Sequence, residues 1–478
     1  MKKALVILLS LAMIGVVFAE EPKPELKVSE FTGSAAVLFG ADLDTGAVAF
    51  NNEASASLKV DIVSGGDKAT SGSGIWGELK IKTDGDPIRV TATNDKRATL
   101  DGYKVVVDVA KLHFGDVAYL GIKQDGTAID YVMLADMAAP YFKVDNTKYY
   151  GQLATTPENT LETLETDYGS VGPNAKYGVV LGVSLPKLVD INVDFRSFDQ
   201  LKTDGSDVAA GAVALSKNAF GLRAKAALTA VDNLTFEAAM NTGFGGKGAY
   251  YDFGFGAKVG YKLPLGDKYY VKPNAAFNGV LKNANGAGVA ATKGSGKLAW
   301  GSHAGVLLGW GDKAKTINTY FFNDSDADWG YYPGVSVGVT MRGDADWPST
   351  QKSPIGLNVS AMSGSIVPNL NAAVAFEVAD LQATNLEMGI AAVAKYDVKM
   401  DPMTITPKFG ISYYSDASKT GKAKTDIYVK AGLDIEKIFP NTTLSFEYAS
   451  NDLNGGVKEG GITDKTMGLF YTKLKISF

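Results

Sequence analysis

A strict two-residue alternation between apolar and polar side chains is the feature that most limits what this chain can fold into. It is most complete over residues 427–436, where Ile427, Val429, Ala431, Leu433 and Ile435 alternate with Tyr428, Lys430, Gly432, Asp434 and Glu436. Successive side chains of a β-strand point to opposite faces, whereas a helix brings apolar residues together every three or four positions. These segments are therefore predicted to be strands with one apolar and one polar face.

The same pattern recurs along much of the chain and includes its last segment. Strand-like segments separated by Gly, Asn, Asp and Lys run from residue 178 to the C-terminus, and others lie earlier, within residues 50–63, 76–82, 103–113 and 117–122. In the final segment, one face holds Phe470, Leu474, Ile476 and Phe478. An aromatic residue that ends such a strand resembles the assembly signal of bacterial outer-membrane β-barrels.

Residues 1–19 read as a secretory signal peptide. Lys2 and Lys3 precede an apolar run from Ala4 to Phe18, and Ala19 provides a small residue for cleavage before Glu20. The apolar run is shorter than the roughly 20 residues that a spanning helix needs, which disfavours the alternative of an N-terminal membrane anchor. We therefore predict that the chain is exported.

Composition narrows the class of protein further. The sequence has no cysteine and only two histidines, His113 and His303, so disulfides, thiol chemistry and His-based metal or acid–base sites are poorly supplied. We expect both histidines to be ordinary strand residues. The formal charge is −5, and it becomes −7 when Lys2 and Lys3 are removed, which argues against nucleic acid as a partner.

We predict an all-β fold, a transmembrane antiparallel β-barrel, because in lipid every backbone amide must be paired and a closed sheet pairs them all. The number of strand-like segments indicates roughly 16 to 24 strands. Residues 20–174 are expected to form an N-terminal β region, either periplasmic or contributing strands to the barrel, with a loop or linker at 135–174. Residues 175–478 are expected to form the C-terminal transmembrane β-barrel. A soluble β-sandwich or β-solenoid also alternates and is the alternative fold.

Several short motifs carry a family resemblance. They are Phe39-Gly40-Ala41-Asp42-Leu43-Asp44-Thr45-Gly46, Trp76-Gly77-Glu78-Leu79-Lys80, Ala110-Lys111-Leu112-His113-Phe114-Gly115 and, near the C-terminus, Thr406-Pro407-Lys408-Phe409-Gly410 with the closing strand. These motifs resemble those of the treponemal major outer sheath proteins and the related Tpr proteins. The resemblance implies an outer-membrane porin, a homotrimer, that also binds host extracellular-matrix proteins as an adhesin.

Charged side chains on the predicted inner faces are the candidate pore lining: Lys395, Lys430, Asp434, Glu436, Glu447, Lys473 and Lys475. In a wide barrel such residues line water and tune selectivity, while solvation at a strand end is the alternative role for each of them. The candidate assembly signal, to be bound by the barrel-assembly machinery, consists of Phe470, Leu474, Ile476 and Phe478.

No sequence pattern supports catalysis, a cofactor or a metal site. The acidic run Asp324-Ser325-Asp326-Ala327-Asp328 lacks the glycine and the distant glutamate of a calcium loop. The tripeptide Arg342-Gly343-Asp344 matches one that adhesion receptors bind, but a match this short arises readily by chance. We predict an outer-membrane porin with lipid as its surroundings and no enzymatic activity; a non-porin surface adhesin or structural protein and a soluble secreted β-protein are the alternatives.

Overall fold

The computed structural model of the chain describes its strands and most of its short turns. The described residues are 25–63, 75–84, 104–123, 177–197, 219–245, 253–281, 297–311, 332–345, 349–350, 352–378, 380–384, 386, 388–415, 425–450, 453, 457–459, 462–465 and 467–477. The predicted signal peptide at 1–19, the expected loop or linker at 135–174, the acidic run at 324–328 and Phe478 lie outside these residues.

One antiparallel sheet of 22 strands contains nearly all of the described structure. Its first half consists of β1 (Glu25–Asp42), β2 (Val48–Val63), β3 (Ile75–Asp84), β4 (Lys104–Phe114), β5 (Ala118–Lys123), β6 (Tyr177–Leu185), β7 (Val189–Ser197), β8 (Ala219–Leu228), β9 (Leu234–Gly245), β10 (Phe253–Tyr261), β11 (Leu263–Leu265) and β12 (Tyr269–Leu281). Its second half consists of β13 (Leu298–Gly309), β14 (Gly334–Asp344), β15 (Ile355–Met362), β16 (Leu370–Val378), β17 (Met388–Tyr396), β18 (Val398–Met400), β19 (Met403–Ser415), β20 (Thr425–Glu436), β21 (Thr442–Ala449) and β24 (Leu469–Ser477).

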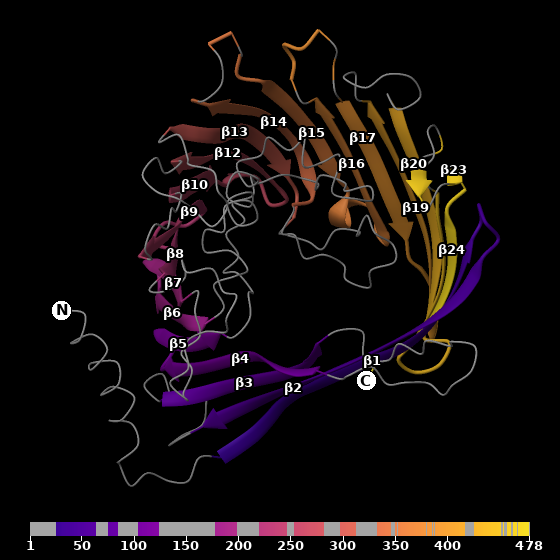
Figure 1. Cartoon of the computed structure of the whole chain (residues 1–478), viewed down its shortest axis with the longest axis horizontal. Helices are drawn as coiled ribbons and strands as arrows, with labels where there is room; N and C mark the ends of the chain where they lie inside the picture. Colours follow the sequence, from indigo (N-terminus) through magenta and orange to yellow (C-terminus); the bar gives the residue numbers. More distant parts are fainter. Residues whose placement is uncertain are drawn as a thin grey trace, which may run out of the picture.

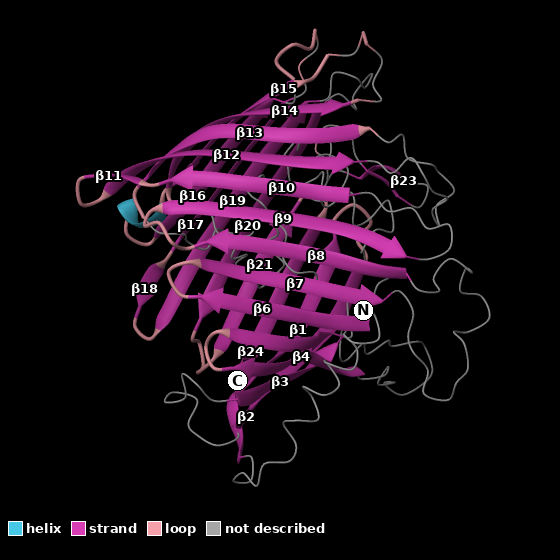
Figure 2. Ribbon diagram, turned by 90° about the vertical axis from the view of Figure 1, so that its left-hand side faces the viewer, coloured by secondary structure: helices cyan, strands magenta, loops and turns pink. Residues whose placement is uncertain are grey.

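The remaining elements are small. A short 3-10 helix, η1 (Gly364–Ile366), follows β15, and the strands β22 (Val457–Glu459) and β23 (Ile462–Lys465) form a separate two-stranded sheet. Figure 2 shows the strands of one wall stacked one above another, with η1 and the turns at their ends.

The large sheet closes on itself. Each strand pairs with its neighbours in chain order, and the first strand β1 pairs with the last strand β24, from Ser34 opposite Ser477 to Asp42 opposite Leu469. The short strands β11 and β18 extend β10 and β17, so 20 of the described strands form the ring. In Figure 1 the strands circle a central space, and β1 crosses below it to reach β24 on the right. The prediction of a transmembrane antiparallel β-barrel is confirmed.

The N-terminal strands belong to the same ring. The sequence left two placements open for residues 20–174, namely the periplasm or the barrel wall. Strands β1 to β5 lie in the large sheet, where β1 and β2 pair along almost their whole length, from Glu25 opposite Val63 to Ala41 opposite Val48. The described part of this region therefore contributes to the wall.

The two ends of the ring are connected differently. At the end that holds the beginning of β1 and the end of β24, most strands are joined by short turns, which span residues 115–117, 186–188, 229–233, 266–268 and 437–441. At the far end the chain connects β3 to β4, β5 to β6 and β7 to β8 through residues 85–103, 124–176 and 198–218. Short turns on the terminal side and long connections opposite are typical of outer-membrane barrels, in which the long connections face outward from the cell.

Candidate functional site

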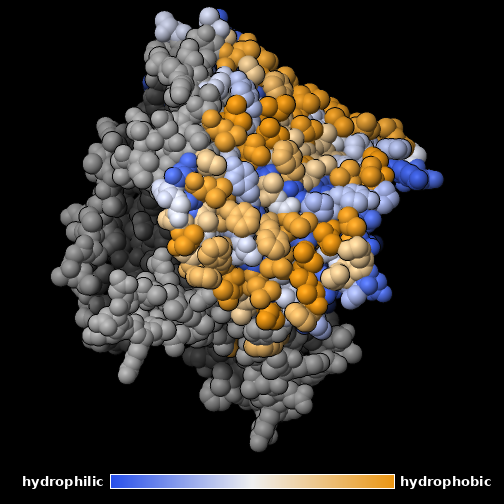
Figure 3. Space-filling model, turned by 90° about the vertical axis from the view of Figure 1, so that its right-hand side faces the viewer, coloured by the Kyte–Doolittle hydropathy of each residue, from blue (hydrophilic) through white to orange (hydrophobic). Residues whose placement is uncertain are grey.

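The two faces of the ring differ in the way that the alternation predicts. In β14 the outward side chains of Val335, Val337 and Val339 are exposed, whereas Ser336 and Thr340, at alternate positions of the same strand, are buried on the inner face. Figure 3 shows that the outer surface over the described C-terminal strands is largely hydrophobic. An exposed apolar belt of this size is unusual for a water-soluble protein and suits a barrel surrounded by lipid.

The residues predicted to line a pore all lie on the inner face. Lys395 is on β17; Lys430, Asp434 and Glu436 are on β20; Glu447 is on β21; and Lys473 and Lys475 are on β24. Strand register brings several of them close, because Ser445 lies opposite both Asp434 and Lys473, and Thr443 lies opposite both Glu436 and Lys475. All of them except Lys395 therefore form one patch across the adjacent strands β20, β21 and β24.

Lys408 of β19 adjoins this patch beside β20, and the sequence analysis did not single it out as a pore residue. Its Nζ lies 2.9 Å from Asp434 Oδ2 and 2.6 Å from Glu447 Oε1. Lys408 and Glu447 are both largely buried, with 9% and 7% of their side chains exposed. A cation held between two carboxylates partly balances the acidic half of the patch.

A second charged cluster, which the sequence analysis also missed, lies across β8, β9 and β10. Glu237 Oε2 is 3.2 Å from Lys225 Nζ, and Glu237 Oε1 is 3.7 Å from Lys258 Nζ. Beside them, Asp194 lies opposite Arg223, and both are almost fully buried. In both clusters the inner face thus holds cations and anions side by side.

His113 takes part in a third group on the inner face, formed by β3, β4 and β5. Its ring stacks flat on Trp76, with centroids 3.7 Å apart, and its Nε2 is 3.1 Å from Glu78 Oε2. Tyr119 packs beside His113 and donates a hydrogen bond from its hydroxyl to Asn192 Oδ1 on β7, at 2.8 Å. The contacts of His113 with Trp76, Glu78 and Tyr119 hold neighbouring strands together, which agrees with the expectation that His113 is an ordinary strand residue. The other histidine, His303, lies on the inner face of β13.

The described candidate assembly residues, Phe470, Leu474 and Ile476, lie on the opposite face of β24 from Lys473. Leu474 and Ile476 are among the exposed hydrophobic side chains, and Phe470 follows the same alternation. Arg342-Gly343-Asp344 forms the end of β14 and pairs with β13. That tripeptide is therefore part of the wall and not of a projecting loop.

Comparison with known proteins yields two relatives of one kind. The major surface protein MspTL of Treponema lecithinolyticum is 28% identical over the whole of this chain and the whole of that protein. The major outer membrane protein MspA of Treponema maltophilum is 49% identical over 133 residues, which are 26% of this chain and 23% of that protein. The chain is a homologue of the treponemal major surface proteins. This confirms the family resemblance of the short motifs, whereas no protein-family model matches the chain.

Two solved structures align with almost the entire length of this Msp homologue. They are OpdQ of Pseudomonas aeruginosa, with 12% identity and a TM-score of 0.39 over 95% of this chain and 97% of that chain, and OccAB4 of Acinetobacter baumannii, with 9% identity and a TM-score of 0.39 over 96% and 99%. The closed ring with its apolar outer face, together with the two Treponema relatives, places the Msp homologue in the bacterial outer membrane.

Within the described ranges the Msp homologue has no helix that is both long and apolar enough to cross a membrane. The same part of the chain holds no group of three or more His, Asp or Glu side chains arranged to hold a metal ion.

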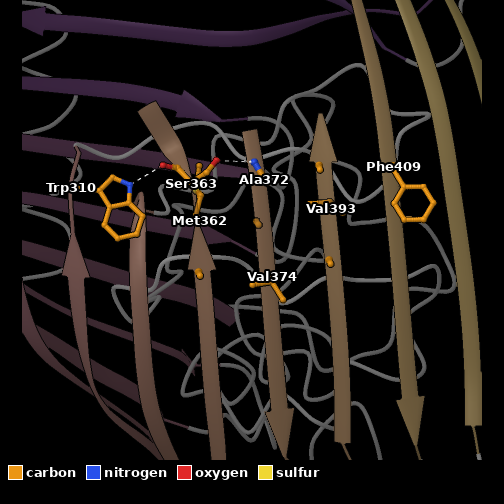
Figure 4. Close-up of a pocket in the computed structure, with 11 residues that line it drawn as sticks. Trp310, Met362, Ser363, Ala372, Val374, Val393 and Phe409 are labelled. Carbon is orange, nitrogen blue, oxygen red and sulfur yellow. Dashed lines mark hydrogen bonds between the residues drawn. The ribbon is translucent and has the colours of Figure 1, made fainter. Parts of the chain in front are cut away.

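One apolar groove, of about 490 Å³, lies at the end of β15, β16 and β17 nearest the chain termini. Five alanines are among its lining residues. Trp310, Val374 and Phe409 border it, as Figure 4 shows. The indole N–H of Trp310 donates a hydrogen bond of 2.8 Å to the Ser363 carbonyl. Because Val374 and Phe409 are outward-facing and exposed, the groove belongs to the lipid-facing surface of the Msp homologue and not to the pore lining.

Proposed function

We propose that this Msp homologue is a water-filled diffusion channel for small hydrophilic solutes. The observation that supports the proposal is the closed ring of 20 described strands whose inner face carries charged and polar side chains and whose outer face is apolar. Barrels of 16 strands or more are wide enough to enclose an aqueous channel. Charges of both signs on the inner wall suit an aqueous path better than a packed core.

We further propose that the channel discriminates weakly between cations and anions. Tight selectivity requires a ring of one charge sign, whereas the patch beside Lys408 and the cluster around Glu237 each combine both signs. A wall with charges of both signs offers a polar passage, and we propose a channel rather than an enzyme.

Purified protein inserted into a planar lipid bilayer is expected to conduct ions, with a small reversal potential in a salt gradient. Neutralising an inner cation by Lys473→Gln should move the reversal potential toward cation preference. Lys268→Gln removes the same charge from an exposed turn and should leave the reversal potential closer to the parent value. Absence of conductance from correctly folded protein would contradict the channel and favour a surface adhesin or structural protein.

We propose that the last strand is also the segment that the outer-membrane assembly machinery binds. The outward face of β24 carries Phe470, Leu474 and Ile476, three of the four candidate signal residues. Deletion of Phe478 should reduce the folded, heat-modifiable fraction in the outer membrane severalfold, because the aromatic end of the signal is lost. Ser477→Ala, which changes the neighbouring residue on the other face, should leave the folded fraction unchanged. Equal yields of the two variants would exclude the signal.

The resemblance to the outer sheath proteins supports two further proposals, a homotrimer and adhesion to host matrix proteins. Chemical cross-linking in intact outer membranes should stop at three copies, and whole protein should be retained on immobilised matrix protein. A ladder that ends at one copy, or no retention, would contradict the respective proposal.

A further inference from the structure

The turn between the first two strands touches the beginning of the last strand. The Asp44 carboxylate accepts hydrogen bonds from two successive backbone amides, Met467 N–H to Oδ1 and Gly468 N–H to Oδ2, each at 2.8 Å. In return, the Leu43 amide donates to the Gly468 carbonyl at 2.8 Å. Residues that are more than 420 positions apart in sequence are therefore joined by three hydrogen bonds.

Local structure on both sides prepares this contact. Asp42 Oδ1 accepts hydrogen bonds from the amides of Asp44, at 2.9 Å, and Thr45, at 3.1 Å, which shapes the turn so that the Asp44 side chain projects from it. On the other side, Gly468 has φ +76, a left-handed conformation that glycine adopts without steric cost. Successive amides around such a residue can point to one anion, as in the anion-binding concavities of other proteins.

The contact lies at the junction that makes the sheet a barrel. β1 and β24 are the first and last strands, and their pairing ends at Asp42 opposite Leu469, next to the turn. Pairing the two ends of the chain costs more chain entropy than any other strand pairing, because the loop that it closes is the longest. An additional contact at this junction therefore offsets a larger entropy loss than a contact within a hairpin does. The candidate assembly signal lies along the outward face of β24, while this contact holds the beginning of that strand.

We propose that Asp44 is a latch that fixes the start of the last strand and thereby completes closure of the barrel. The latch consists of the Asp44 carboxylate and the backbone amides of Met467 and Gly468. The latch gives the two aspartates of the Asp42-Leu43-Asp44-Thr45-Gly46 motif separate roles. Asp42 shapes the turn, and Asp44 binds the beginning of the last strand.

Refolding and unfolding of the full-length mature protein in lipid vesicles tests the latch. Asp44→Ala should lower the ratio of folded to unfolded protein by about tenfold or more, because hydrogen bonds to a charged group are among the strong ones. Asp44→Asn, which retains one acceptor oxygen, should fall between Asp44→Ala and the parent. Asp116→Ala removes an exposed acid from the turn between β4 and β5 and should have little effect; equal behaviour of Asp44→Ala and Asp116→Ala would overturn the proposal.

A second experiment separates closure from a local effect on the first hairpin. The chain has no cysteine, so Val37→Cys with Leu474→Cys introduces the sole pair of thiols, at positions directly opposite on β1 and β24. Once this disulfide joins the two strands, Asp44→Ala should regain most of its lost folded fraction. If the loss persists in the linked protein, Asp44 acts within its own hairpin and the latch is wrong.

Discussion

Val429→Lys is expected to reduce the free energy of unfolding by about 2 to 4 kcal/mol. Val429 lies near the middle of β20, on the outward face, opposite Ile411 of β19, whose side chain is exposed on the apolar surface. A lysine there puts an ammonium group against hydrocarbon, where no water or counter-charge compensates it. The unfolding free energy in lipid vesicles measures the cost.

The matched control places the same lysine on the inner face. Ser445→Lys on β21 lies opposite both Asp434 and Lys473, so its ammonium group meets water and a carboxylate that offsets the like charge of Lys473. We expect this variant to remain close to the parent in stability. Equal losses from Val429→Lys and Ser445→Lys would contradict the assignment of the two faces.

Lys408→Met is expected to cost about 3 to 5 kcal/mol, which is typical of removing one partner from a buried ion pair. The substitution leaves the Asp434 and Glu447 carboxylates facing each other without the cation that now lies within 3 Å of both. The methionine fills similar volume, so the loss reports mainly the uncompensated charge. Chemical denaturation of the folded barrel measures it.

Two variants check this interpretation. Lys399→Met removes a lysine from the exposed strand β18 and should have little effect on stability. Adding Glu447→Gln to Lys408→Met removes one of the two stranded carboxylates and should recover part of the loss. If Lys408→Met matches Lys399→Met, the cluster contributes nothing to stability.

Alternation carried most of what the sequence could predict about the wall. In β20 each predicted inward residue, such as Lys430 or Asp434, lies on the inner face, because side-chain direction in a strand depends only on position along it. The same rule applied to β14 and β24. Fold class follows from such segments repeated many times in an exported chain.

The alternation rule could not predict which side chains on neighbouring strands form ion pairs. Lys408 contacts Glu447 only because β19, β20 and β21 pair in a particular register. The alternation within a single strand does not determine its register with a segment about 40 residues away. The proline before Lys408 also hides the strand, since Pro407 reads as an edge or a break. The pairing of Asp194 with Arg223 escaped prediction for the same reason.

The Asp44 contact is a still longer-range case. The motif around it is visible in the sequence as a turn, since Asp and Gly at these positions favour one. What the turn binds becomes clear only when β1 and β24 lie side by side. A short motif can therefore identify a family while its physical role depends on the opposite end of the chain.

The most direct test of a lipid-surrounded ring with an aqueous interior is cysteine labelling along β20 in the folded barrel. Because the parent has no cysteine, single substitutions at positions 429 to 434 each provide one reporter. Cysteines at 429, 431 and 433 are predicted to react with a lipid-soluble thiol probe, and those at 430, 432 and 434 with a water-soluble one. A reversed pattern, or water-soluble labelling at every position, would contradict the barrel described by the structure.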